Sequence, residues 1–366
     1  MTLRLHWFLP LHGDGREVAK SADGVAEARN IRREPELNYL GQVAQAVDGL
    51  GFAGALVPTG LFCEDPWLVS AALSQQTRNM HFMIACRPSS LPPMVCAQSA
   101  ATFQRLSGSR LMLNIVTGGD ADEQRRYGDW LDHDERYART EEFLDVFHQA
   151  WRGEPFDFHG KHYQIKAGLL SRPHDVRPTI LLGGSSAAAQ RVAAAHADVY
   201  LAWGERPDGL TSLTGRVGEL AAERGRSIEF GTRFHVISRD TAQEAWAVTR
   251  RLLDGMDASR IADAQRRFRR TESEGQRRMA ALHGGRTDDL EVYPNVWAGY
   301  GLVRPGAGAA LVGSHEQVAE RIAEYHALGM NHLILSGQPH LEEAYNFAEG
   351  VLPLLRRQGL LGQEAS

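Results

Sequence analysis

The chain has 366 residues, of which 43% are apolar and 23% charged, and a formal net charge of −5. This is the composition of a globular protein and argues against a disordered chain. The negative charge excludes a globally basic surface for nucleic acid or an anionic membrane, so a small anion would have to be bound by a local cluster of cations.

Short apolar segments alternate with segments of helical spacing along most of the chain. The apolar segments predict eight buried strands, at residues 3–9, 53–58, 81–86, 111–116, 179–182, 199–203, 229–237 and 331–335. The helical spacing predicts helices at residues 37–50, 67–77, 93–106, 136–151, 187–196, 210–224, 241–253, 316–328 and 341–355. Residues 156–163 predict a small hairpin beside this repeat.

About eight strand–helix units, with polar and glycine-rich residues after the strands, predict a (β/α)8 TIM barrel formed as a single domain over residues 1–366. An open doubly wound sheet is the alternative, and the number of strands disfavours it. Residues 16–36 and 254–303 are charged and break the rhythm. We expect both to be insertions, because loops of this length are usually functional.

Two arginines and a histidine predict the centre of a site. Residues 232–237 alternate polar and apolar side chains as a strand does, which places Arg233 and His235 on one face. Arg304 lies in the glycine-rich residues 299–313, a composition typical of mobile loops. A lone histidine is more often a core residue, but an arginine is rarely buried without an anionic partner. The three side chains together would suit a small anionic substrate.

Other polar residues follow or interrupt the predicted strands. The segment Gly-Gly-Ser-Ser at residues 183–186 could hold a phosphate at a helix N-terminus, and a tight turn with a serine cap is an equal alternative. The amide of Asn114, inside an apolar strand, needs a partner, either a flavin edge or a neighbouring strand. Arg87 directly follows a strand, and we expect it to point to the barrel mouth or to form a surface ion pair.

The three cysteines, Cys63, Cys86 and Cys96, form no CxxC pair and fit free thiols in a reducing compartment. Acidic neighbours, Glu64 and Asp65, raise the pKa of the Cys63 thiol and make it a poor nucleophile. The histidines show no metal-binding spacing, so we expect no metal. The N-terminal apolar stretch is short for a signal peptide, and no apolar run approaches about 20 residues. We therefore expect a cytoplasmic protein that binds neither membrane nor nucleic acid.

The chain resembles a known family over residues 3 to about 355. Motifs such as VPTGLFCED (57–65), LNIVTGGD (113–120), RFHVI (233–237) and GLVRPGAG (301–308) are similar to those of the flavin-dependent alkanesulfonate monooxygenases, in the bacterial-luciferase-like superfamily. The resemblance implies a (β/α)8 barrel that uses O2 and reduced FMN (FMNH2) supplied by a separate NAD(P)H-dependent flavin reductase. It implies that an organosulfonate is cleaved to an aldehyde and sulfite. A homodimer or homotetramer is expected.

The resemblance also carries residue roles to matching positions. It implies catalytic roles for Cys63, Arg233, His235 and Arg304. It implies substrate contacts for Trp203, Arg304, Gln338 and His340. It implies FMN contacts for Thr59, Asn114, Tyr137, Gly184, Ser185 and Ser186.

The chain departs from the family at three places: Gln338 replaces a tyrosine, Leu61-Phe62 replaces Arg-Ser, and Ala202 replaces a threonine. Because an amide suits hydroxyl groups, a sulfosugar such as sulfoquinovose is an alternative to a simple alkanesulfonate. A relative that uses the deazaflavin F420, or cleaves another C–S or C–C bond, is a second alternative, which the joint presence of the two arginines and the histidine disfavours. A non-catalytic flavin-binding protein is a third, and Arg304 argues against it.

Overall fold

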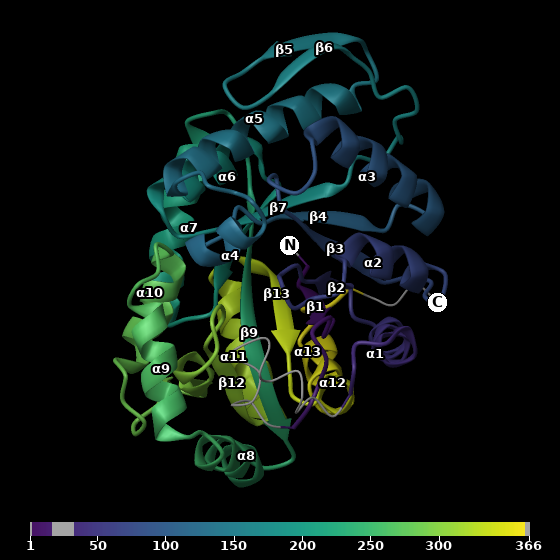
Figure 1. The fold of residues 1–366 in the computed structure, drawn as a ribbon. Coiled ribbons are helices and arrows are strands. Elements are labelled where there is room, and N and C mark those ends of the chain that lie inside the picture. The colour runs from purple at the N-terminus through teal and green to yellow at the C-terminus, as the bar shows by residue number, and fades with distance from the viewer. Residues whose placement is uncertain (1, 17–32, 363–366) are drawn as a thin grey trace.

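A computed structural model describes residues 2–16 and 33–362, in which eight parallel strands close into a barrel surrounded by helices (Figure 1). Strand β9 closes the ring by pairing with both β8 and β13. The (β/α)8 barrel and its eight predicted strands are confirmed. In ring order the strands are β1 (Arg4–Phe8), β2 (Gly54–Val57), β3 (His81–Cys86), β4 (Leu111–Ile115), β7 (Thr179–Gly183), β8 (Val199–Trp203), β9 (Glu229–Arg239) and β13 (Met330–Ser336).

Helices connect the strands and cover the outside of the barrel (Figure 1). They are α1 (Leu37–Gly49), α2 (Pro66–Ser74), α3 (Pro93–Ser107), α5 (His133–Trp151), α6 (Ala187–His196), α7 (Pro207–Ala222), α11 (His315–Ala327), α12 (His340–Gly350) and α13 (Leu352–Arg357). The predicted closing helix is thus two helices, because Pro353 lacks the N–H that a continuous helix requires. Short α4 (Ala121–Arg126) was not predicted, since its six residues carry no apolar periodicity. The hairpin of β5 (Phe156–His159) and β6 (Gln164–Gly168) lies outside α5.

The inside of the barrel has its own apolar core, separate from the larger core between strands and helices. Its members are Phe8, Leu56, Met83, Met112, Leu181, Val199, Leu201 and Ile334. Side chains of a strand alternate between the two faces, so residues two positions later also point inward. This rule places Asn114, Trp203 and Ser336 inside the barrel at its carboxyl-terminal end, which we call the barrel mouth.

A long insertion separates β9 from α11. It contains α8 (Ala242–Asp254), α9 (Ala258–Phe268), α10 (Glu274–His283), the hairpin of β10 (Glu291–Tyr293) and β11 (Val296–Trp297), the 3-10 turn η2 (Gly299–Leu302) and β12 (Ala310–Ser314). Strand β12 pairs with the second half of β9, beyond the end of β8. Helices α9 and α10, the β10–β11 hairpin and η2 lie within residues 254–303, so the predicted insertion is largely helical. Most of the other predicted insertion, residues 16–36, lies outside the described residues.

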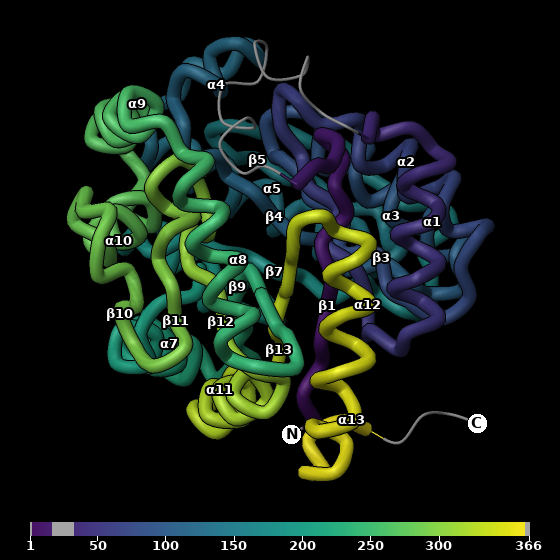
Figure 2. Tube along the Cα trace, turned by 90° about the horizontal axis from the view of Figure 1, so that it is seen from below, coloured from purple at the N-terminus to yellow at the C-terminus, as the bar shows by residue number. Residues whose placement is uncertain are grey.

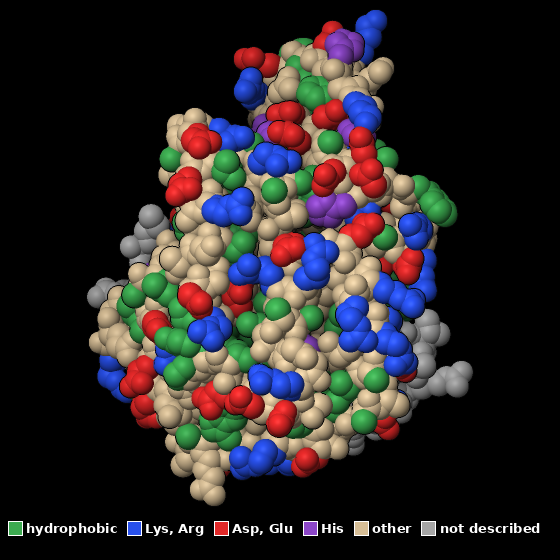
Figure 3. Space-filling model, turned by 90° about the vertical axis from the view of Figure 1, so that its left-hand side faces the viewer, with side chains coloured by type: hydrophobic (Ala, Val, Ile, Leu, Met, Phe, Trp, Pro, Cys, Tyr) green, Lys and Arg blue, Asp and Glu red, His purple; other side chains and the backbone are tan. Residues whose placement is uncertain are grey.

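The two ends of the described chain meet below the barrel, where the Leu3 N–H donates to the Leu360 carbonyl at 3.0 Å beside α13 (Figure 2). On the face that carries α7, α9 and α10, acidic and basic side chains are intermixed (Figure 3). Within residues 2–16 and 33–362, no helix is both long and apolar enough to cross a membrane.

Candidate active site

The register of the barrel strands brings predicted site residues together at the barrel mouth. Trp203 on β8 lies opposite Arg233 on β9, and Ser336 on β13 lies opposite His235. The insertion supplies a further wall, because a Cβ built on Gly306 would lie 3.9 Å from the Trp203 ring. Parallel strands thus place side chains from distant parts of the sequence in one pocket, as in other barrels of this class.

Arg233 is a half-buried cation with no counterion among the described residues. Its guanidinium carbon lies 4.3 Å from the centre of the Phe8 ring, and its Nε is buried without a hydrogen-bond partner. Burial, and then the nearby Arg304, lower the pKa of Arg233 to about 9. No carboxylate of the described residues contributes to this shift. The position favours a small anion, which would restore the charge balance.

Arg304 enters the same pocket from the insertion, and its Nη2 lies 3.4 Å from Nε2 of His12. Burial, followed by Arg304, lowers the pKa of both His12 and His340 to about 3. The ring of His340 stacks on Phe8 at 5.5 Å, and its backbone N–H donates to the Asp14 carboxylate at 2.7 Å. The pocket therefore combines two arginines with neutral imidazoles at neutral pH.

His235 is buried and both of its ring nitrogens have partners. Nε2 lies 3.1 Å from the Ala307 carbonyl oxygen, and Nδ1 lies 2.9 Å from the Ser336 hydroxyl. The ring stacks on Tyr300 with centres 4.0 Å apart. Burial first, then the two arginines, hold the pKa of His235 well below 6.5. Sequence reasoning missed His12, Tyr300 and Ser336. Ser336 could have been found from the sequence, because strand alternation places its side chain on the same face as that of Ile334, two residues earlier.

The Gly-Ser segment lies at a different part of the mouth, at the start of α6. Gly184 has a φ of +143°, and a Cβ there would lie 2.6 Å from Ala189 Cβ and 2.7 Å from the Tyr137 hydroxyl. The Ser186 hydroxyl caps α6 by accepting from the Ala189 N–H at 3.2 Å. Burial raises the pKa of Tyr137, while hydrogen bonds to Ser186 and Thr117 oppose the shift. The serine cap is therefore present.

A cavity of about 400 Å³ opens in front of this segment. Basic and hydroxyl-bearing side chains outnumber the two carboxylates on its wall. Its polar lining includes His133, Ser185, Ser186, Gln190, Ser212, Arg216, Glu272, Glu274, Arg277 and Arg278.

The remaining predicted residues have varied surroundings. Asn114 is half-buried inside the barrel, between Ala85 and Leu181 of the neighbouring strands. Thr59 is half-buried in the loop after β2. Gln338 follows β13, and its side-chain oxygen Oε1 is buried without a hydrogen-bond partner.

Cys63 and Arg87 lie beside α4. The pKa of the Cys63 thiol is raised to about 12, in the predicted direction, but the causes are burial first and then Glu123, with Glu64 a smaller contribution. Arg87 is buried and forms an ion pair of 2.8 Å with Glu123, whose side chain is partly exposed. The ion pair that one interpretation expected is therefore present, with its cation buried. A carboxylate sixty residues away in the sequence therefore helps to raise the pKa of Cys63.

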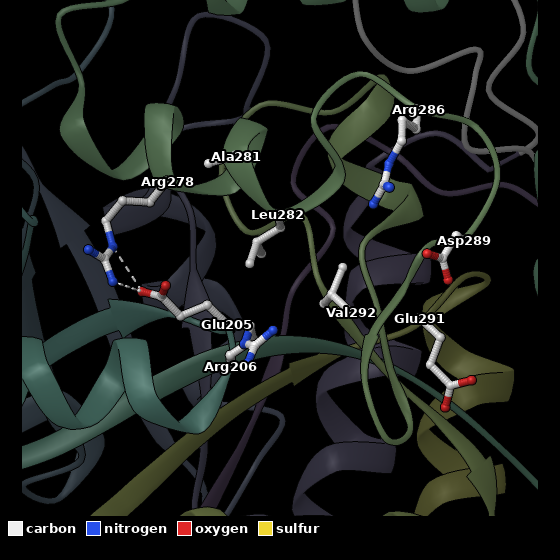
Figure 4. Close-up of a pocket in the computed structure, with 9 residues that line it drawn as sticks. All are labelled: Glu205, Arg206, Arg278, Ala281, Leu282, Arg286, Asp289, Glu291 and Val292. Atoms are coloured by element: carbon white, nitrogen blue, oxygen red, sulfur yellow. Dashed lines mark hydrogen bonds and ion pairs between the residues drawn. The ribbon is translucent and has the colours of Figure 1, made fainter.

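A second cavity, of about 450 Å³, lies between the β8–α7 turn and the insertion (Figure 4). Arg278 and Glu205 point toward each other on one side of it and pair at 2.7 Å. Arg206, Arg286, Asp289 and Glu291 add charges of both signs, so this cavity lacks the cationic excess of the barrel mouth. The described part of the chain contains no group of three or more His, Cys, Asp or Glu residues arranged for a metal.

Comparison with known proteins identifies the family. The family model described as luciferase-like monooxygenase matches residues 3–332. The chain belongs to this family. The match covers seven of the eight barrel strands in full, the start of β13 and the insertion.

Solved structures share the fold at low sequence identity. A riboflavin lyase, solved with modified FMN and riboflavin, has a TM-score of 0.81 and 18% identity over 100% of this chain and 94% of its own. The EDTA monooxygenase of Chelativorans sp. BNC1 has a TM-score of 0.79 and 18% identity over 99% and 95%. An F420-dependent secondary alcohol dehydrogenase has a TM-score of 0.68 and 16% identity over 97% and 100%. One fold therefore serves flavin and deazaflavin proteins.

The residues present fit an FMN phosphate at the Gly-Ser segment. Gly184, with a φ of +143° and no space for a Cβ beside Ala189 and Tyr137, allows the tight turn that precedes α6. The segment precedes a ten-residue helix, whose N-terminus favours negative charge. Arg216 on the cavity wall adds positive charge, whereas Arg277 is paired with Glu274 at 2.7 Å. These donors are compatible with a bound anion.

Proposed function

We propose that the protein is a monooxygenase that uses reduced FMN and O2 to release sulfite from an organosulfonate, leaving an aldehyde. One observation carries the proposal: Arg233 is held at the barrel mouth, beside Arg304, with no carboxylate of the described residues offsetting its charge. A sulfonate has one negative charge spread over three oxygens. Two guanidinium groups match such a ligand in charge and in hydrogen-bond geometry.

FMN would be held by the Gly-Ser segment, with Ser185 and Ser186 at its phosphate and Tyr137 beside them, and with Asn114 and Thr59 facing its ring system. When bound, FMN supplies the oxygenating chemistry. An NAD(P)H-dependent flavin reductase would supply the reduced form. We further propose a cytoplasmic enzyme that forms a homodimer or homotetramer, which sedimentation of the purified protein tests.

The side chains of the chain itself then bind and shield the substrate. Arg233 and Arg304 bind the sulfonate oxygens, and they stabilise the additional negative charge that develops as sulfite leaves. Trp203 and His340 form apolar and aromatic walls around the carbon atom that bears the sulfur. Residues 299–308, which carry Arg304, cover the pocket and exclude water from the reacting atoms. Cys63 contributes as a neutral thiol, because its pKa of about 12 keeps it protonated.

Gln338 supports a polyhydroxylated substrate. Its Oε1 is buried without a partner, and such an acceptor is costly unless a ligand donates to it. A sugar hydroxyl is such a donor, whereas the hydrocarbon chain of an alkanesulfonate is not. Within organosulfonates the geometry therefore favours a sulfosugar such as sulfoquinovose over a simple alkanesulfonate.

The test is sulfite release by purified protein with FMN, a flavin reductase, NADH and air. Sulfoquinovose is compared with a series from methanesulfonate to octanesulfonate, and a reaction without reductase is the blank. We expect sulfite from sulfoquinovose, and its loss in Arg233→Met. Sulfite from the alkanesulfonates alone would return the assignment to the usual substrates of the resembled family.

Absence of sulfite with every sulfonate, from protein that binds reduced FMN, would contradict the proposal. The alternative of a luciferase-like flavin or F420 oxidoreductase acting on another C–S or C–C bond would then take its place.

A further inference from the structure

Residues 299–308, which we call the arginine loop, are tied at their base by neutral hydrogen bonds. The Gly301 N–H donates to the Gly308 carbonyl at 3.0 Å, and a Cβ on Gly308 would lie only 2.7 Å from Gly301 Cα. Gln265 on α9 donates to the Leu302 carbonyl at 2.9 Å. Gln276 on α10 accepts from the Gly306 N–H at 2.9 Å. The insertion helices thus hold one side of the loop.

The barrel holds the other side through the side chain of His235. Its Nε2 lies 3.1 Å from the Ala307 carbonyl oxygen, and its ring stacks on Tyr300, whose own carbonyl accepts from the Arg304 N–H at 2.9 Å. A loop residue on either side of Arg304 is therefore in contact with the same imidazole.

The partners of His235 determine where its proton lies. A carbonyl oxygen can only accept, so Nε2 must carry the hydrogen that points at Ala307. Nδ1 of the neutral ring is then an acceptor, and its partner is the Ser336 hydroxyl at 2.9 Å. The Ser336 hydroxyl thus donates to Nδ1, and the Nε2–H donates to the Ala307 carbonyl, so both ring nitrogens are hydrogen-bonded.

We propose that Ser336 is a positioning residue: it fixes the Nε2–H tautomer of His235, which thereby holds the Ala307 carbonyl and keeps Arg304 over the barrel mouth. His235 then acts by holding the arginine loop, and it is not a general base for the reaction. The activity part of this inference rests on the proposed function, but the loop geometry does not.

The chain offers a matched control for Ser336. Ser238 is also buried, lies at the end of β9, and places its hydroxyl 2.6 Å from Nδ1 of His315. It points to the other face of the strand from His235. Ser238→Ala therefore deletes the same kind of serine–histidine hydrogen bond without touching the arginine loop.

The first measurement needs neither flavin nor substrate. Hydrogen exchange of the purified protein, followed by mass spectrometry, compares the peptide covering residues 299–308 in the wild type, Ser336→Ala, Ser336→Thr and Ser238→Ala. Loss of one buried hydrogen bond in the chain should speed exchange of this peptide about tenfold in Ser336→Ala. Ser336→Thr, which keeps the hydroxyl, should restore slow exchange, and Ser238→Ala should leave the peptide unchanged.

Nitrogen NMR of the imidazoles gives a second, independent signature. The His235 signals are assigned by their loss in His235→Gln. We expect a protonated Nε2 and an unprotonated, hydrogen-bonded Nδ1 in the wild type, and a mixture of tautomers in Ser336→Ala. A wild-type ring with its proton on Nδ1 would overturn the inference, and so would equal exchange in Ser336→Ala and Ser238→Ala.

The kcat of two His235 variants then distinguishes a role in holding the arginine loop from a role in proton transfer. The side-chain amide introduced by His235→Gln places an N–H near the position of Nε2, whereas the shorter amide of His235→Asn places one near Nδ1. If His235 holds the loop, His235→Gln should keep kcat within about tenfold of the wild type and His235→Asn should lose far more. Equal losses in both would show that proton uptake is needed and would overturn the holding role. Wild-type protein without any sulfite release would contradict the proposed function instead, and leave the exchange and NMR results to decide the loop contact.

Discussion

Replacing Arg233 with methionine should make the folded protein more stable while abolishing sulfonate binding. The side chain is half-buried at the barrel mouth, and its charge is disfavoured by desolvation and by Arg304. Methionine keeps an unbranched apolar side chain over the Phe8 ring and removes the charge. Functional residues often carry such a cost to stability, because they are placed for a ligand rather than for the fold.

The pKa of Arg233 gives the magnitude. At about 1.4 kcal/mol per pKa unit, the drop from 12.5 to about 9 means that folding disfavours the charged form by about 5 kcal/mol. The contact of the guanidinium with Phe8, at 4.3 Å, offsets roughly 1–2 kcal/mol of this. We expect Arg233→Met to raise the free energy of unfolding by roughly 2–4 kcal/mol at pH 7. The gain should shrink as pH rises through about 9, because the folded wild type then loses the unfavourable charge.

Arg110→Met is the matched control, and the expected sign is opposite. Arg110 is buried, but its guanidinium donates five hydrogen bonds, to carbonyls of Ser74, Thr77, Met80 and Ser107 and to the Thr77 hydroxyl. Its removal leaves these acceptors unsatisfied and should cost about 3–5 kcal/mol. Urea unfolding of both variants and the wild type, in buffer without sulfate or phosphate, measures the difference. Similar destabilisation by both replacements would refute the idea that Arg233 is uncompensated.

Four further predictions follow from the site. The affinity of the wild type for a sulfonate, measured by calorimetry, should fall as pH rises through about 9, because Arg233 is cationic below its pKa and neutral above it. Gly184→Ala should weaken FMN binding at least about tenfold in a fluorescence titration, since its Cβ would meet Ala189 and Tyr137, whereas Gly225→Ala, with open space around it, should leave binding unchanged. The Cys63 thiol should resist iodoacetamide at pH 8 because its pKa is about 12, and rapid alkylation of this residue would contradict that environment. Gln338→Tyr should shift the ratio of sulfite release from sulfoquinovose to that from octanesulfonate at least about tenfold toward the alkane; an unchanged ratio would remove Gln338 from substrate choice.

The sequence alone determined the barrel. Eight short apolar segments separated by helical spacing have few solutions other than a closed parallel sheet, because each strand must be buried on both faces. The period-two alternation of residues 232–237 also determined that Arg233 and His235 share a face, and the structure has them on the same strand, β9. Local chemistry was sufficient for these features, since they depend on neighbours in the chain.

The insertion shows where local signals stop. Residues 258–268 and 274–283 form helices that the sequence pattern did not separate from loop, because their charged faces outweigh a narrow apolar stripe. Packing of both helices against η2 buries this stripe. Likewise, only the tertiary structure shows that β12 pairs with the second half of β9.

The contacts that give the site its chemistry were decided by tertiary structure. The pKa of Cys63 depends on burial and then on Glu123, and the pKa of Arg233 depends on burial and then on Arg304. Both ring nitrogens of His235 contact residues about seventy and one hundred positions away. Burial and Coulomb interactions act over a few ångströms in space, and sequence periodicity carries no information about which strand ends and loops lie within that distance. The residue types at the mouth were thus readable from the chain, and the fold alone set their protonation and their partners.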